Sequence, residues 1–354
     1  MMASDMPRED PRASAIADIV ADRWPGARID ALTHLAGDFS ARRYLRATLR
    51  AGGAPATAIV MVLSGSGLPL SSEELGVFPE PPRELPFLDV HRLLTTIGVP
   101  VPEVYAAAVD RGIILLEDGG DVVLWERAIA SPDRAEELYR RALDVLLLLH
   151  TRGSTCDDRS SIAFRQRFDE RLLLWELEHF VEYGIERRLA IALTPTQRRG
   201  LDESFTAIAT ELAAAPTVLS HRDYHSWNIL VRGNVPLVID FQDALLAPAE
   251  YDLASLLTDR ITPRLVTPAM EQRLLAYYWG ARGIETTDRH RYCLTALHRA
   301  LKVIGRVQYV ALEKGKRGAL EFLPDAAATA RRMLDQLDLP GGLASEFAAL
   351  PWPT

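Results

Sequence analysis

Two short apolar runs constrain the fold of this chain more than any other feature. The first, PTVLS, ends at Ser220, and the second, VPLVID, ends at Asp240. Each run is too short for a helix and long enough for a buried strand, whereas the sequence on both sides of the pair has helical periodicity. The polar segment between them includes HRDYHSWN, which favours a loop. The sequence therefore predicts a polar loop framed by two strands inside a mainly helical region.

The rest of the chain divides into a β-rich part and a helical part. Residues 28–63 have the pattern of short β segments separated by turns, and a helix is expected over Pro86–Ile97, closed by Gly98. Two further strands are expected on either side of a turn at Asp110–Gly112. Helical periods then dominate at 132–151, 164–190, 195–215, 266–281 and from 287 to the end.

This order of elements predicts an α+β fold with two lobes. We expect residues 1–117 to form a small lobe with an antiparallel β-sheet and one helix, and residues 118–121 to form a hinge. Residues 122–354 are expected to form the larger, mainly helical lobe. A site at the junction of two lobes is a common place for small-molecule binding, so we expect the active site in the cleft between them.

The composition argues against several classes of protein. The net charge of the 354 residues is -8, which disfavours nucleic acid as a partner because phosphate neutralisation needs clustered cations. No stretch approaches the roughly 18 apolar residues of a membrane span, and the first residues lack the pattern of a signal peptide. The two cysteines, Cys156 and Cys293, are expected to be free thiols in a reducing cytoplasm.

Three oxygen-bearing side chains occur in and after the polar loop, at Asp223, Asn228 and Asp240. Phosphoryl transfer needs a carboxylate that orients the attacking hydroxyl and accepts its proton. It also needs oxygen ligands, here an amide and a second carboxylate, that hold Mg²⁺ against the phosphates of the donor. Each of these residues alone is typical of a turn or a strand end. All three at this spacing, framed by two strands, favour an ATP- and Mg²⁺-dependent kinase.

The same segment resembles known kinase families. His-Arg-Asp followed by Asn228, and then Asp240-Phe241, is similar to the catalytic loop and metal-binding motif of protein kinases. The continuation IDFQDALLAPAEYDLASLL resembles the aminoglycoside phosphotransferase superfamily. Within it, the catalytic loop, the strand end IDFQDA and the turn at Leu35–Tyr44 resemble the family of anomeric kinases of N-acetylmuramate and N-acetylglucosamine. The resemblance extends from about residue 14 to about residue 340, with these motifs as its specific part.

The resemblance implies a protein-kinase-like fold and a role for each matching residue. Asp223 corresponds to the catalytic base, and Asn228 and Asp240 correspond to the metal ligands. Asp252 corresponds to a buried aspartate that braces the catalytic loop. The implied activity is ATP-dependent phosphorylation of the anomeric hydroxyl of an N-acetylated amino sugar in cell-wall recycling.

The nucleotide-binding half has one match and one departure. The residues Gly37, Asp38 and Ser40 lie between two predicted strands, where a turn covers the phosphates in kinases, although an ordinary hairpin turn has the same pattern. The segment with Glu117 and Asp118 resembles the hinge that binds adenine through its backbone.

The departure is that the kinase lysine of the next strand is absent. Met61 falls near its position, and the three lysines of the chain are Lys302, Lys314 and Lys316. We expect Arg43 or Arg46 to substitute for this lysine, or the phosphates to be held by Mg²⁺ and backbone. For both arginines a solvent-facing strand position is the alternative.

The acceptor-binding residues are less constrained by the sequence. Trp175 and Glu178 lie on a predicted helix and suit a sugar pocket, although a tryptophan among leucines is more often part of a core. Arg222 and His225 flank the predicted base, where they either contact the sugar or brace the loop. Asp243 is a further candidate for a sugar hydroxyl or a second metal.

Two other functions remain open from the sequence. An aminoglycoside or a choline-like molecule is an alternative acceptor on the same fold. A non-catalytic pseudokinase is the other alternative; the missing lysine favours it, whereas the presence of Asp223, Asn228 and Asp240 argues against it.

Overall fold

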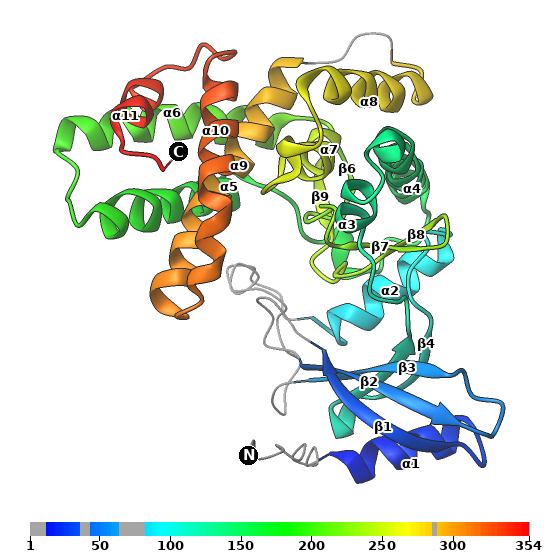
Figure 1. Ribbon diagram of the computed structural model, residues 1–354. Coiled ribbons are helices and arrows are strands. Elements are labelled where there is room, and N and C mark those ends of the chain that lie inside the picture. The colour runs from blue at the N-terminus through cyan, green and yellow to red at the C-terminus, as the bar shows by residue number, and fades with distance from the viewer. Residues whose placement is uncertain (1–11, 36–42, 64–81, 285–288, 354) are drawn as a thin grey trace. The chain divides into compact units, whose positions relative to one another are not determined.

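The structure is a computed structural model that describes residues 12–35, 43–63, 82–284 and 289–353. It consists of two compact units (Figure 1). The first comprises residues 1–69 and 101–120, and the second comprises residues 70–100 and 121–354. The chain therefore enters the second unit at Asp121, at the end of the expected hinge. Residues 82–100, which we expected in the small lobe, group with the larger unit.

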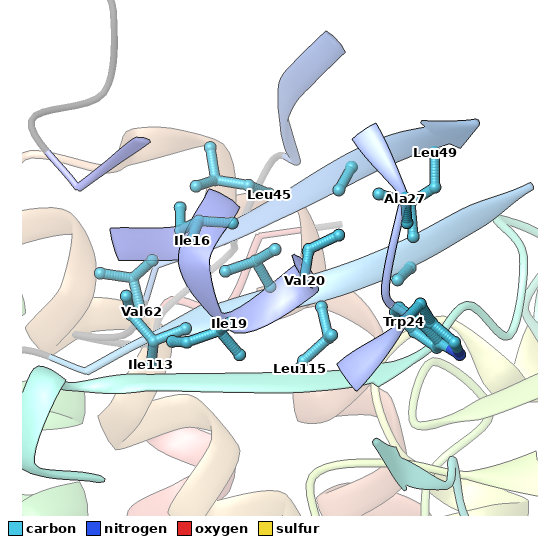
Figure 2. Close-up of a cluster of buried hydrophobic side chains, with 13 residues drawn as sticks. Ile16, Ile19, Val20, Trp24, Ala27, Leu45, Leu49, Val62, Ile113 and Leu115 are labelled. Carbon is cyan, nitrogen blue, oxygen red and sulfur yellow. The ribbon is translucent and has the colours of Figure 1, made fainter. Parts of the chain in front are cut away.

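The first unit is an antiparallel sheet with one helix. Its strands are β1 (Arg28–Leu35), β2 (Arg43–Arg50), β3 (Thr57–Val62), β4 (Val104–Ala108) and β5 (Ile113–Glu117), in the order β1-β2-β3-β5-β4. The helix α1 (Ala13–Arg23) was not predicted, although Ile16, Ile19 and Val20 have helical spacing. These side chains pack on alternate residues of the strands, such as Leu45 and Leu115 (Figure 2). One face of the sheet is thus an apolar core, and β2 residues of the opposite parity, such as Arg46, lie on the other face.

The helix expected at Pro86–Ile97 is α2 (Pro86–Thr96). Proline at its first position fits the helix start, and Gly98 ends it with a φ of +79°, which suits glycine. Because α2 belongs to the larger unit, the helix that covers the small sheet is α1.

The larger unit is mainly helical. Its other α-helices are α3 (Leu124–Ile129), α4 (Ala135–Thr155), α5 (Glu170–His179), α6 (Pro195–Ala214), α7 (Ala249–Thr258), α8 (Pro268–Ala281), α9 (Arg289–Glu313), α10 (Leu323–Leu334) and α11 (Leu343–Ala349). The helix α5 continues as a π-helix over Phe180–Arg187, and α9 packs beside α10 (Figure 1). The predicted fold class, a small antiparallel sheet with a larger helical part, is confirmed.

In the part of the larger unit that the structure describes, four short strands interrupt the helices. They are β6 (Thr217–Ser220), β7 (Ile229–Arg232), β8 (Val235–Val238) and β9 (Leu245–Pro248). The two predicted strands, β6 and β8, do not pair with each other: β6 pairs with β9, and β8 pairs with β7. The polar loop therefore leaves one two-stranded ribbon and enters the other.

Two further features of the described residues bear on the sequence predictions. Cys156 and Cys293 are free thiols. Among the helices that the structure describes, none has the length and apolar character of a membrane span.

Candidate active site

Asp252 on α7 holds the start of the polar loop. Its side chain is fully buried, and its carboxylate accepts hydrogen bonds from the backbone N–H groups of His221 at 2.9 Å and Arg222 at 3.0 Å. The ring of His150 on α4 contacts the same carboxylate, with 2.9 Å between Nε2 and Oδ2. Burial opposes ionisation of Asp252, but the hydrogen bond from His150 and the nearby His221 lower its pKa. This geometry fits the bracing role that the resemblance implied for Asp252.

Arg222 is buried below the loop. Its backbone has a φ of +77°, a left-handed conformation that is costly for a residue other than glycine. Its guanidinium donates to Glu176 Oε1 of α5 at 3.0 Å, and both side chains are at most 2% exposed. Of the two roles considered for Arg222, these contacts favour loop bracing over sugar binding.

Asp223, the predicted base, is held from α9. Its side chain is 36% exposed, and Arg299 Nη2 lies 3.5 Å from its Oδ1. The same guanidinium donates to the carbonyl oxygen of Arg222 at 2.7 Å and to Asp259 at 2.5 Å. Partial burial opposes ionisation of Asp223, but Lys302, Arg299 and Arg222 lower its pKa well below the usual value. Asp223 is therefore a carboxylate at neutral pH.

Asn228 directly precedes β7 and Asp240 follows β8, so both lie at the open end of the β7–β8 hairpin. The backbone N–H of Ile239 donates to the carbonyl oxygen of Asn228 at 3.0 Å, which brings the two predicted metal ligands to one end of the ribbon. Asn228 Nδ2 donates to the backbone oxygen of Asp223 at 3.0 Å, so its Oδ1 is left to act as an acceptor. Asp240 is exposed and has a φ of +61°, a strained conformation that is often found at functional sites.

This donor set fits Mg²⁺ bound together with a nucleotide. Mg²⁺ prefers oxygen ligands and takes one or two carboxylates from the protein, with phosphate oxygens and waters as the other ligands. An amide oxygen and one exposed carboxylate match that pattern. Among the residues that the structure describes, no cluster of three or more His, Cys, Asp or Glu forms a closed metal site.

The residues after Asp240 anchor it to α2. The ring of Phe241 is 1% exposed and stacks on Phe87 with 5.0 Å between centroids. The amide of Gln242 donates to Asp240 at 2.9 Å and lies 3.4 Å from Asp243 Oδ2. Asp243, the candidate for a sugar hydroxyl or second metal, thus lies in the same turn as Asp240.

His225 supports the loop from inside. It is 6% exposed, and its Nε2 lies 3.4 Å from Asn228 Nδ2. Burial and the nearby Arg260 lower the pKa of His225 to about 3, so the ring is neutral at physiological pH. A neutral ring beside Asn228 fits loop bracing, one of the two roles considered for it.

Of the predicted nucleotide-binding residues, Gly37, Asp38 and Ser40 lie outside the described residues. Arg43 is exposed at the start of β2. Glu117 ends β5, where its carboxylate accepts from the backbone N–H of Glu103 at 3.1 Å.

Asp118 forms an ion pair with Arg46 of β2. Its carboxylate accepts two hydrogen bonds from Arg46, at 2.6 and 3.0 Å, and one from the backbone N–H of Gly120. Burial opposes ionisation of Asp118, but Arg46 lowers its pKa. Arg46, one of the two arginines considered for the missing lysine, therefore pairs with the hinge segment. Met61 is fully buried.

The predicted acceptor residues on α5 lie apart from the loop contacts. Trp175 is half-buried and stacks on His179 with 5.0 Å between centroids. Glu178 forms an ion pair with Arg198 of α6. The residue of α5 that meets the loop is Glu176, which the sequence did not identify.

Arg299, Lys302 and Asp259 were also missed. The signal for Lys302 was its rarity, since only three of the 40 Lys and Arg residues are lysines. Glu176 had a signal too, because it is an acid within the apolar run LLLWEL. Arg299 and Asp259 had none, because their partners are distant in the sequence.

Comparison with known proteins shows the family to which this chain belongs. The family model described as APH, phosphotransferase enzyme family, matches residues 31–294. The N-acetylmuramate/N-acetylglucosamine kinase of Pseudomonas putida KT2440 is 31% identical over 254 residues, which are 69% of this chain and 72% of that protein. The protein of the same name from Pseudomonas aeruginosa PAO1 is 29% identical over 253 residues, with the same coverage of both chains.

Solved structures show the fold. A choline kinase from Cryptosporidium parvum Iowa II has a TM-score of 0.60 at 12% identity, over 91% of this chain and 94% of that one. The ADP-bound aminoglycoside phosphotransferase APH(2'')-Ib has a TM-score of 0.57 at 15% identity, over 90% and 96%. The chain therefore belongs to the APH phosphotransferase enzyme family and is an ATP-dependent phosphotransferase.

Proposed function

We propose that this enzyme is a sugar kinase that transfers the γ-phosphoryl group of ATP to the anomeric hydroxyl of N-acetylmuramate or N-acetylglucosamine. Two relatives at about 30% identity carry these sugars in their names. A role in cell-wall recycling follows from the same relationship, because both sugars are components of peptidoglycan.

The observation that carries the choice of acceptor is the charge around Asp223. The cations that lower its pKa are Lys302, Arg299 and Arg222. An aminoglycoside is a polycation and choline a cation, so either would meet like charges here. A neutral or anionic sugar does not have this cost. We therefore favour the sugar over the amine acceptors.

The residues present suggest a direct in-line transfer. Asp223 orients the acceptor hydroxyl and takes its proton as the new O–P bond forms. The bond between the γ-phosphorus and the bridging oxygen breaks, and ADP leaves with that electron pair. Asn228 and Asp240 would hold Mg²⁺, which when bound neutralises charge on the phosphates. Arg299 keeps the carboxylate of Asp223 in place during the transfer.

An ADP-release assay with Mg²⁺-ATP and a panel of acceptors tests the proposal. The panel contains N-acetylmuramate, N-acetylglucosamine, glucose, choline and an aminoglycoside. We expect turnover of the N-acetyl sugars with loss of their reducing-end reactivity, because the anomeric hydroxyl becomes a phosphate ester. Turnover of an amine alone would refute the sugar acceptor, and retained reducing-end reactivity would refute the anomeric position.

A further inference from the structure

Lys302 on α9 has no assigned role, although it belongs to the cluster around the predicted base. Its Nζ lies 2.9 Å from Glu176 Oε1 and 3.3 Å from the hydroxyl of Tyr251. Arg299, one turn earlier on α9, contacts Asp223. The same face of one helix therefore presents two cations to the catalytic loop.

One buried carboxylate contacts two of the cations in this cluster. Glu176 pairs with both Lys302 and Arg222, at 2.9 and 3.0 Å. Burial opposes ionisation of Glu176, but Lys302 and Arg222 lower its pKa to about 2, so it carries one negative charge at neutral pH. Glu176 therefore does not neutralise both cations by itself, and Asp223, whose pKa Lys302 lowers, is the other carboxylate near Lys302.

Lys302 is the member of this group that solvent reaches. Its side chain is 16% exposed, compared with 2% for Arg222 and 1% for Glu176. An ammonium group has three N–H donors, and the described partners of Lys302 are Glu176 and Tyr251. Its third donor can therefore bind an acceptor oxygen from a ligand.

We propose that Lys302 binds a carboxylate of the acceptor and gives this enzyme a preference for N-acetylmuramate over N-acetylglucosamine. This inference rests on the proposed function. The two sugars share the ring, the N-acetyl group and the anomeric hydroxyl, and differ by a lactyl ether that carries a carboxylate. A lysine suits this role because its ammonium is a compact charge on a flexible stem.

The ratio of kcat/KM for the two sugars measures this preference in the full-length protein. We compare the parent with Lys302→Met, Lys302→Arg and, as a control, Lys316→Met, which alters an exposed lysine outside α9. In Lys302→Met, the buried carboxylate of Glu176 still has its ion pair with Arg222, so the substitution does not leave it without a cation. N-acetylglucosamine reports within the same protein that the active site is folded.

We expect Lys302→Met to lower kcat/KM for N-acetylmuramate by roughly 10- to 100-fold, mainly through KM, as for a lost charge-assisted hydrogen bond. For N-acetylglucosamine we expect a smaller loss, in kcat rather than in KM, because Lys302 lies in the cluster around Asp223 but that sugar lacks the carboxylate; the ratio of the two kcat/KM values therefore falls. Lys302→Arg should keep part of the preference, and Lys316→Met should match the parent.

Two results would overturn the inference while leaving the proposed function intact. One is an unchanged ratio in Lys302→Met. The other is an equal loss on both sugars, which would assign Lys302 to the transferred phosphoryl group or to the fold. A parent that turns over neither sugar would instead overturn the proposed function, and this inference with it.

Discussion

Asp252→Asn tests whether the catalytic loop depends on one buried carboxylate. The two oxygens of Asp252 face three donors: the backbone N–H groups of His221 and Arg222, and the ring of His150, all at 2.9 to 3.0 Å. Asparagine has nearly the same shape but replaces one acceptor oxygen with an amide that donates. In the variant, at least one of these donors therefore faces another donor in a fully buried place.

The expected loss of stability follows from these contacts. A hydrogen bond to a charged group contributes about 1.5–3 kcal/mol, and a buried donor left unsatisfied costs about 1–3 kcal/mol. We therefore expect the free energy of unfolding to fall by about 3–5 kcal/mol, a large part of the roughly 5–15 kcal/mol of a typical protein. We also expect a lower kcat, because Asp223 directly follows the two residues that Asp252 holds.

Urea unfolding followed by circular dichroism measures the first effect, and steady-state ADP release measures the second. Asp202→Asn is a matched control, because Asp202 on α6 is about half exposed and forms an ion pair with Arg198 at 2.8 Å. Loss of such a surface pair costs about 0–1 kcal/mol. A parental urea midpoint and kcat in Asp252→Asn would refute the bracing role.

Three further predictions concern the base, the metal ligand and pH. Asp223→Ala should lower kcat roughly 10²–10⁴-fold with ATP affinity unchanged by calorimetry, because the base acts on the acceptor; a parental kcat would contradict this. Asp240→Ala should raise the Mg²⁺ concentration for half-maximal activity by about tenfold or more, and an unaltered Mg²⁺ dependence would reject the ligand role. Burial lowers the pKa of His298 from 6.5 to about 4, so between these values the unfolded state binds more protons and stability falls as pH falls. His298→Gln should remove up to about 3 kcal/mol of that pH dependence, and parallel curves of unfolding free energy against pH for variant and parent would rule it out.

The candidate base and metal ligands could be predicted from the sequence because their pattern is local. Asp223 and Asn228 lie in one loop between two apolar runs, and Asp240 ends the second run. The pattern depends on nearby residues alone, so it is readable without knowledge of the tertiary structure. The helix at Pro86 was predictable for the same reason, since proline begins it and Gly98 ends it.

Strand pairing in the larger unit was not predictable in the same way. The strand β9 has four residues and ends in Pro248, a residue that argues against a strand. It forms because β6 is its partner in the ladder. Pro248, its last residue, directly precedes α7. Short strands of this kind are fixed by their tertiary contacts, which the sequence pattern does not contain.

The partners of the loop were missed for a related reason. Helical periodicity indicates which face of α9 is apolar, but not that Arg299 on this helix is buried against Asp223. On α5 the sequence drew attention to Glu178, whereas the buried acid is Glu176, two residues earlier. Residues two apart point to different sides of a helix, so an error of this size changes the partner completely.

The missing lysine has a consistent explanation in terms of charge. In protein kinases this lysine pairs with a glutamate of the following helix. Here β3 carries the buried Met61, and the acid of α2 is Asp89, which accepts hydrogen bonds from Ser161 Oγ at 3.0 Å and from the backbone N–H of Ile162 at 2.6 Å. Loss of the lysine therefore leaves no unpaired carboxylate at Asp89.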